Sequence, residues 1–384
     1  MRDIRELFPT DDPVLPEMVI GRVGDVEELA DRLAGGTHVV IAGPRRTGKS
    51  TVGLAALSRL EPKATYSAAV DLWDHEDLPA LIAALVRSIL ANRGPVAKAL
   101  RLAREGGSEL RDLLPRGVTA SLRTHLGEEV ELAWAVPSTH RAGANLAGAV
   151  RLAQRIAERD DKRIVLFLDE FQDIASKRFG DADTLTKQLR SELQRSPRVS
   201  VLFAGSMEHL MRDLFGPGRR ALSQFGSFHQ LSEILPSEWR QGIVERLREL
   251  RIDALPDAIT AVVSRSEGHP RTTMLIARET VSVALSRRQE RRIDHGDVLG
   301  GWDLAAAADR LRHEEIVERL RSTAHAYPIA LRVARAQRPY SGTAPAGARR
   351  ALNMMEKAGI AERSARGAWR IPEPLLREYL ATRP

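Results

Sequence analysis

The chain of 384 residues contains no cysteine, only 4% aromatic residues and no long uninterrupted apolar run. Without cysteine it can have no disulfide, no thiolate metal site and no cysteine nucleophile, and this fits a reducing compartment. Every apolar run falls short of the ~18 residues that a membrane-spanning helix needs. Residues 1–9 carry charges where a signal peptide has an apolar core. These absences predict a cytoplasmic protein that does not enter a membrane.

The rest of the composition is that of a globular protein, with 43% hydrophobic and 28% charged residues, and the length suits two or three domains. The formal net charge of +7 is concentrated near the C-terminus. Residues 312–384 hold 14 basic and 7 acidic residues, whereas residues 1–311 hold 44 of each. A local basic excess is expected of a solvated surface and equally of a segment that binds nucleic acid.

A glycine-rich motif is the most informative feature. An apolar run, 37–43, precedes it and a helix-like segment, 51–60, follows it, which is the strand–loop–helix order of a phosphate-binding loop. In such loops backbone N–H groups wrap the β-phosphate, the lysine reaches the β- and γ-phosphates, and the serine hydroxyl ligates Mg²⁺. A chance match arises roughly once per 100 unrelated chains of this length. The predicted nucleotide-binding residues, for ATP or ADP, are Gly43, Pro44, Arg45, Arg46, Thr47, Gly48, Lys49, Ser50 and Thr51.

A second motif is Asp169-Glu170, which directly follows the five-residue apolar run 164–168. An apolar run of this kind suits a parallel strand buried on both faces, with acidic residues at its carboxyl end. There Asp169 can hold the Mg²⁺ shell together with Ser50, and Glu170 can polarise an attacking water. The alternative is a buried strand that merely ends in a polar loop.

Short strand-like runs at 64–71, 199–206 and 228–234 alternate with helical patterns at 76–92, 146–159, 183–195 and 207–215. This alternation predicts an α/β fold with a parallel sheet covered on both faces. One strand is expected between the strands of the two motifs, as in P-loop ATPases that have a catalytic glutamate and unlike nucleotide kinases. Ser206 ends a strand near the expected γ-phosphate, so it is a candidate phosphate sensor or, alternatively, a helix N-cap.

The two motifs are separated by more residues than a minimal sheet requires. The excess lies at about 94–145 and includes 129–136, which alternates like a half-exposed strand. Such an insertion is either a partner surface or a decorated loop.

The basic segment has a pattern of its own. Helices are predicted at 324–336 and 345–359, the second with Leu352, Met355 and the following Ile360 on an apolar face and Gly359 at its end. Strands at 360–363 and 367–371 and a closing helix at 375–380 complete a winged helix-turn-helix. Its candidate DNA-binding residues are Arg349 and Arg350 early in the recognition helix and Arg363, Arg366 and Arg370 in the wing. A winged helix that binds protein or inhibits its own chain is the alternative.

Taken in series, these motifs resemble the archaeal-type ATPases of the STAND/AAA+ lineage, which are similar to origin-recognition ATPases and transposition helpers. The likeness covers roughly residues 18–384. It rests on Ile20-Gly21-Arg22, Glu27-Glu28-Leu29, the phosphate-binding loop, residues 168–172, Gly205-Ser206, Gly218-Arg219 and Gly268-His269-Pro270-Arg271.

The resemblance implies further roles. Ile20, Gly21 and Arg22 would lie beside the adenine, Arg271 would contact bound phosphate from a helical lid, and Arg219 or Arg220 would act across a subunit boundary or as a switch contact. For each arginine a solvated position or a lid salt bridge is the alternative. The implied domains are an N-terminal lead-in at 1–17, an ATPase core at 18–235, a lid and linker at 236–311 and the winged helix at 312–384.

The sequence therefore predicts a DNA-associated ATPase that uses ATP and Mg²⁺, binds double-stranded DNA and associates with itself or with a protein partner. Two other functions fit the same residues. One is a slow nucleotide-dependent signalling switch whose winged helix binds protein, and the other is a scaffold that holds nucleotide without turning it over.

Overall fold

The computed structural model describes residues 2–10, 12–91, 120–123, 129–132, 142–206, 208–218, 220–287, 292–363 and 368–383. The chain forms two compact units. The first comprises Met1–Val23, Pro44–Gly48 and Ser232–Pro384, and the second comprises Gly24–Gly43 and Lys49–Leu231. Among the described residues no helix is long and apolar enough to cross a bilayer.

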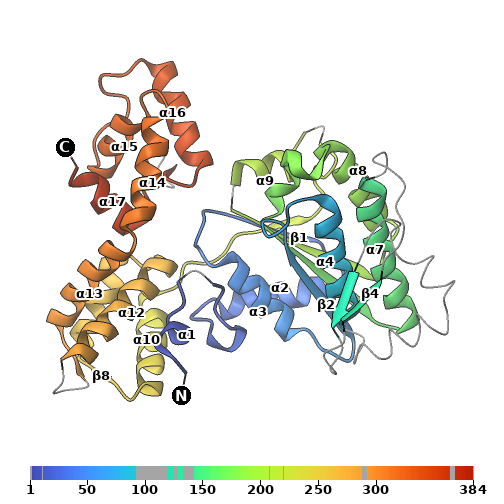
Figure 1. The fold of residues 1–384 in the computed structure, drawn as a ribbon, viewed down its shortest axis with the longest axis horizontal. Helices are drawn as coiled ribbons and strands as arrows, with labels where there is room; N and C mark the ends of the chain where they lie inside the picture. Colours follow the sequence, from blue (N-terminus) through green and yellow to red (C-terminus); the bar gives the residue numbers. More distant parts are fainter. Residues whose placement is uncertain are drawn as a thin grey trace. The chain divides into compact units, whose positions relative to one another are not determined.

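The second unit is built on a five-stranded parallel sheet, as predicted (Figure 1). Strand β6 lies between β1, which leads into the phosphate-binding loop, and β5, which ends in Asp169, and this confirms the expected intervening strand. In their order across the sheet the strands are β2 (Thr65–Asp71), β5 (Arg163–Asp169), β6 (Val199–Gly205), β1 (Val39–Ala42) and β7 (Ser227–His229).

Both faces of this sheet are covered, because successive side chains of a strand point to opposite faces. Ile164, Leu166 and Leu168 of β5 belong to one hydrophobic core with side chains of α4 and α7. Phe167 faces the other side, where a Cβ added at Gly53 of α3 would come within 2.6 Å of its ring. The helices of this unit are α2 (Val23–Ala34), α3 (Lys49–Arg59), α4 (Leu78–Ala91), α7 (Ala142–Arg159), α8 (Ala182–Leu193) and α9 (Glu208–Phe215).

Two predicted strands differ from those in the structure. The strand predicted at 228–234 is wrong after His229, since residues 230–234 are irregular and lead to Pro236, which starts the next helix. The strand predicted at 129–136 begins as β4 (Glu129–Leu132), which pairs antiparallel with β3 (Ala120–Arg123). Residues 133–136, like most of the predicted insertion, lie outside the described residues.

The first unit is mainly helical and has two separate cores. One core joins α1 (Ile4–Leu7), α10 (Pro236–Glu249), α11 (Pro256–Arg265), α12 (Pro270–Ser286) and α13 (His295–Ala308) around the buried Trp239. Short strands β8 (Asp253–Ala254) and β9 (Arg292–Ile293) pair beside it. The other core lies among α14 (Arg310–Arg321), α15 (Ala326–Ala334), α16 (Pro345–Lys357) and α17 (Pro374–Ala381).

The elements predicted for the basic segment are present in the expected order. Helix α16 starts at Pro345, buries Leu352 and Met355, and ends before Gly359, whose φ of +67° is the left-handed conformation typical of a glycine after a helix. Strands β10 (Glu362–Arg363) and β11 (Trp369–Arg370) pair antiparallel, and α17 closes the segment.

Candidate functional site

The phosphate-binding loop connects β1 to α3, the helix that begins at Lys49. Arg46 and Gly48 have φ values of +64° and +87°, so two residues of the loop have a left-handed backbone. The Lys49 side chain is 5% exposed, and its Nζ donates to the Gly43 carbonyl at 3.1 Å. Thr47 Oγ1 donates to the Pro44 carbonyl at 2.9 Å. A curled loop with a lysine folded over it at a helix N-terminus can bind phosphate.

Asp169 and Ser50 are brought together at the carboxyl edge of the sheet. Asp169 is 7% exposed and accepts a hydrogen bond from the Ser50 side chain. Burial raises the pKa of Asp169, and the neighbouring Glu170 carboxylate adds to this; hydrogen bonds from Ser50 and the Glu170 N–H, together with the charge of Lys49, offset it only in part. A hydroxyl and a carboxylate short of positive charge are oxygen donors that fit Mg²⁺.

Glu170 has a left-handed backbone, with φ of +45°, directly after β5. Its Oε2 accepts hydrogen bonds from Ser206 Oγ at 2.7 Å and from Gln172 Nε2 at 2.5 Å. Gln172 is 1% exposed, and its Oε1 accepts from the Ser206 N–H at 3.1 Å. The ends of β5 and β6 therefore form a closed hydrogen-bonded ring around the Glu170 carboxylate. Gln172 lies within the motif 168–172, but the sequence alone predicted no role for it.

Asp71 is a second residue that the sequence interpretation missed. It ends β2 and lies in register with Asp169 on the neighbouring strand. Burial, followed by repulsion from Asp169, Asp74 and Glu170, raises the pKa of Asp71 to about 6, against an opposing hydrogen bond from the Trp73 N–H. The available signal was that 64–71, like 163–169, is an apolar run that ends in aspartate.

The segment Ile20–Arg22 contacts the phosphate-binding loop within the first unit. Arg22 donates one hydrogen bond to the Thr47 carbonyl and, through Nε, another to the Ser232 carbonyl at 2.8 Å. Ile20 is buried against α10, where a Cβ at Gly242 would come within 2.5 Å of it. Arg22 thus links the phosphate-binding loop to the segment at Ser232 by hydrogen bonds. A place for this segment beside adenine stays a prediction.

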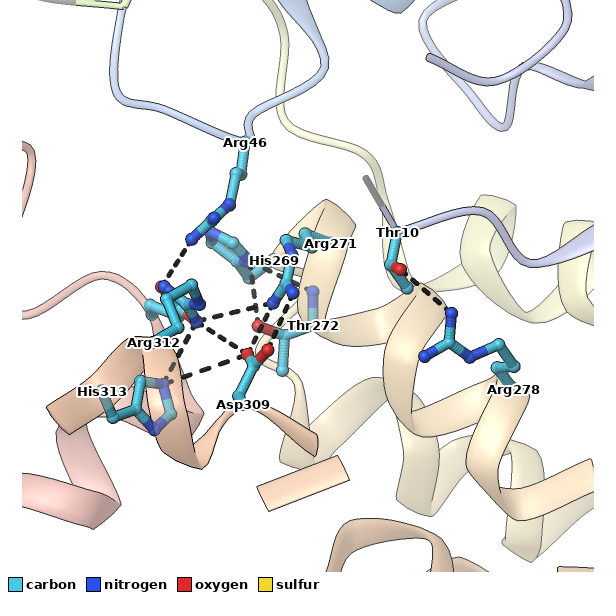
Figure 2. A network of polar contacts seen from close by, with 10 residues as sticks. Thr10, Arg46, His269, Arg271, Thr272, Arg278, Asp309, Arg312 and His313 are labelled. Carbon is cyan, nitrogen blue, oxygen red and sulfur yellow. Dashed lines mark hydrogen bonds and ion pairs between the residues drawn. The ribbon is translucent and has the colours of Figure 1, made fainter. Parts of the chain in front are cut away.

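Arg271 lies in the first turn of α12 and is 9% exposed (Figure 2). Its guanidinium binds both oxygens of Asp309, at 2.5 and 2.8 Å. The lid salt bridge, one of the two alternatives for this residue, is therefore present, and contact with nucleotide phosphate stays a prediction. Arg220 is exposed, and Arg219 lies outside the described residues.

The candidate DNA-binding arginines lie on the surface of the C-terminal segment. Arg349 and Arg350 are exposed in the first half of α16. In the hairpin, the Arg363 guanidinium stacks 5.4 Å from the centre of the Trp369 ring, and Arg370 pairs with Glu362 at 2.7 Å. Arg366 lies outside the described residues. Of these side chains, Arg370 is already neutralised by a carboxylate.

No protein-family model and no curated protein matches this chain in sequence. Several solved structures match its fold. The Walker-type ATPase paby2304 of Pyrococcus abyssi matches with a TM-score of 0.66 at 16% identity, over 97% of this chain and 99% of that one. The Aeropyrum pernix ORC2 protein in its ADPNP-ADP complexes matches with a TM-score of 0.60 at 16% identity, over 99% and 96%.

The Aeropyrum pernix ORC1 protein in complex with DNA also matches, with a TM-score of 0.53 at 18% identity, over 99% of this chain and 96% of that one. At such identities the likeness concerns the fold. The chain has the fold of a P-loop ATPase, and the match extends over nearly its whole length.

Proposed function

We propose that this chain is an ATPase of AAA+/STAND type, which binds Mg-ATP, hydrolyses it, and couples its nucleotide state to a basic C-terminal winged helix that binds DNA. The observation that carries the proposal is the meeting of three groups at one sheet edge. The phosphate-loop serine is hydrogen-bonded to Asp169, the last residue of β5, and Glu170 is the next residue of the chain. The fold shared with a Walker-type ATPase supports this assignment.

Each residue of the site has a distinct task in this mechanism. The N–H groups of residues 43–50 and the Lys49 ammonium hold the phosphates, and Ser50 with Asp169 would hold Mg²⁺, which neutralises phosphate charge when bound. Glu170 orients the attacking water and accepts its proton. Ser206 and Gln172 keep the Glu170 carboxylate in place.

Other parts of the mechanism rest on the family resemblance. Ile20, Gly21 and Arg22 lie beside the adenine, and Arg271 contacts the bound phosphate from the lid. Arg219 or Arg220 acts across a subunit boundary or as a switch contact. Turnover per molecule that rises with protein concentration is expected if that arginine acts in trans. Turnover independent of concentration would contradict self-association as a requirement.

The hydrolytic assignment is tested by Glu170→Gln. The variant should bind Mg-ATP as the parent does but release phosphate roughly 10²–10⁴ times more slowly, because it has lost its general base. Glu27→Gln, at an exposed position of α2, is the matched control and should retain full turnover. Equal phosphate release by all three proteins would show that Glu170 is not the base.

The order α15, α16, β10, β11, α17 supports a winged helix, and the localised basic excess supports DNA as its ligand. Removing Arg349 and Arg350 together should weaken duplex binding and lower the salt-dependence slope by about 2. Arg59→Ala/Lys63→Ala removes the same charge from exposed positions of the second unit and should leave binding unchanged. Duplex binding that is insensitive to salt would contradict the proposal.

A slow switch whose winged helix binds protein is the second candidate, and one observation favours it. The Glu170 carboxylate already accepts two hydrogen bonds from protein groups, and these compete with an attacking water for the same oxygen. Single-turnover measurements with and without duplex DNA separate the candidates. Slow phosphate release that duplex does not change favours the switch, whereas stimulation lost in the Arg349→Ala/Arg350→Ala variant favours the DNA-associated ATPase.

A further inference from the structure

Four segments of the first unit bring charged side chains together into one group, here called the arginine cluster (Figure 2). Its members are buried or partly buried except Arg46, whose side chain is 37% exposed. Each segment contributes from the end of an element or from a loop. The members are Arg46 from the phosphate-binding loop, Arg271 from the start of α12, Asp309, Arg312 and His313 from the start of α14, and Glu373, which directly precedes α17.

Glu373 is the carboxylate that these segments share. It is 8% exposed and accepts two hydrogen bonds from the Arg312 guanidinium, one of them at 3.0 Å. Its oxygens also lie 4.0 Å from guanidinium nitrogens of Arg46 and Arg271. Asp309 completes the group by pairing with Arg271 and with Arg312. One carboxylate of the C-terminal segment therefore lies within ion-pair distance of a guanidinium of the phosphate-binding loop.

The cluster holds more positive than negative charge, with three guanidiniums for two carboxylates. Burial opposes ionisation of Glu373, but hydrogen bonds from His313 and Arg312 outweigh it and hold the pKa of Glu373 well below its usual range. Burial, followed by repulsion from Arg312 and Arg271, lowers the pKa of Arg46 to about 10, and Glu373 and Asp309 offset only part of this. Arg46 is thus a cation in a site already short of anions.

A metal ion is a poor occupant for this cluster. Ligand atoms of Asp309, His313 and Glu373 lie within 4.8 Å of one another, a spacing that a cation could use. Both carboxylates, however, already bind guanidiniums, and a divalent cation would add to an existing positive excess. The charge balance favours an added anion instead.

We propose that Glu373 sets the nucleotide affinity of the phosphate-binding loop by acting as an internal competitor of phosphate. This rests on the proposed function, because it requires that the loop bind nucleotide. The Glu373 carboxylate holds Arg46 through its charge, and a triphosphate on the loop offers the same guanidinium more negative charge and paired oxygens. Binding therefore exchanges the carboxylate for phosphate at Arg46.

The exchange also affects the C-terminal segment. Glu373 directly precedes α17, and the first turn of that helix closes with a hydrogen bond from the Arg377 N–H to the Glu373 carbonyl at 2.9 Å. The ion pair between Glu373 and Arg46 weakens nucleotide binding. By linkage, bound nucleotide weakens this ion pair by the same factor. Glu373 is in this way both an affinity-determining residue and the point where nucleotide loosens α17.

The test uses the full chain and Mg-ADPNP, with dissociation constants measured by titration calorimetry. Glu373→Gln should bind Mg-ADPNP at least about fivefold more tightly than the parent, since a neutral amide competes less for Arg46. Glu356→Gln, which removes a carboxylate from an exposed position of α16, is the matched control and should bind as the parent does. Equal or weaker binding by Glu373→Gln overturns the proposal.

A second measurement needs no variant. Saturating the parent chain with Mg-ADPNP should speed amide hydrogen exchange over residues 374–381 severalfold, because Glu373 then loses its ion pair with Arg46. Unchanged or slower exchange there overturns the proposal even if Glu373→Gln fails to fold. A parent chain that binds no Mg-ADPNP removes the proposed function and this inference with it, whereas a parent that binds and a variant that binds no better removes the inference alone.

Discussion

Two buried aspartates of this molecule carry opposite pKa shifts. Asp169, at the sheet edge of the second unit, is 7% exposed, and burial raises its pKa. Asp309, in the arginine cluster of the first unit, is 3% exposed, yet hydrogen bonds from Arg271 and Arg312 outweigh burial and lower its pKa. The difference lies in their partners, which are mainly a hydroxyl and an N–H in one case and two guanidiniums in the other. A buried carboxylate that lacks a full counter-charge, such as Asp169, is suited to bind a metal cation. A buried carboxylate that is paired with guanidiniums, such as Asp309, stabilises the fold.

Of the tests of this difference between Asp169 and Asp309, substitution of Asp169 should have the largest effect, and that effect is on ATP turnover. Asp169→Asn removes a poorly compensated buried charge, so the free energy of unfolding should fall by less than about 1 kcal/mol or should rise. Mg²⁺-dependent ATP turnover should drop about a hundredfold or more, because the metal loses a ligand. Denaturant unfolding and phosphate release measure the two quantities. A strongly destabilised variant with intact turnover would reverse the assignment of Asp169.

In the arginine cluster, the same aspartate-to-asparagine substitution should mainly reduce stability. Asp309→Asn leaves Arg271 without its bidentate partner, and this should cost about 3 kcal/mol of unfolding free energy. Glu315→Gln, at an exposed position of the same helix, should cost less than about 0.5 kcal/mol. Denaturant unfolding of both variants checks this. If Asp309→Asn proves as harmless as Glu315→Gln, the cluster does not hold the first unit together.

Titration of the half-buried His38 in the second unit should change stability by a smaller amount. Burial, followed by the Arg163 charge, lowers the pKa of His38 to about 4, and its Nδ1 accepts from the Val201 N–H at 3.2 Å. In the unfolded chain His38 binds a proton below about pH 6.5, whereas in the folded chain it binds one only below about pH 4. The free energy of unfolding therefore falls as the pH drops from about 6.5 to about 4.

Between pH 7.5 and pH 5 this one histidine should account for about 2 kcal/mol of lost stability. His38→Asn keeps an acceptor for the Val201 N–H but cannot titrate, so its loss over the same interval should be smaller by that amount. Unfolding curves at the two pH values measure the difference. Equal losses in parent and variant would mean that His38 is not the titrating group.

The smallest effect is expected at Gln172, which is hydrogen-bonded to Glu170 and Ser206 at the sheet edge. Gln172→Leu removes one hydrogen bond to Glu170 and one from the Ser206 N–H, so kcat should fall about tenfold while KM for ATP stays the same. Steady-state kinetics separate this positioning role from a binding role. A raised KM with unchanged kcat would place Gln172 in substrate binding instead.

The sequence predicted the second unit better than the contacts of the first. The strands and the phosphate-binding loop follow from apolar runs and glycines that are local in the chain, and parallel strands bring their carboxyl ends to one edge by geometry. This is why Ser50, Asp169, Glu170 and Ser206 could be placed near one another from the sequence. The strand predicted at 230–234 failed because the local pattern there has no paired neighbouring strand beyond His229.

The arginine cluster could not be predicted in this way. Asp309 and Glu373 are ordinary acidic residues at the ends of helices, and no spacing rule links either of them to Arg271 or to Arg46. Their meeting depends on how several helices pack, which sequence periodicity does not specify. The resemblance did draw attention to Arg271, but it offered phosphate as the partner, and the partner that the structure provides is Asp309.

Glu373 lies just before the last helix, so changes at the end of the chain can affect the phosphate-binding loop. A protease cut or an early stop codon before residue 373 would remove only α17 and its flanks, a change that is easily taken for the loss of a dispensable tail. It would also leave three guanidiniums facing a single carboxylate, with the phosphate-binding loop among them. Shortened versions of this protein are therefore expected to differ in the loop itself, more than three hundred residues upstream of the cut.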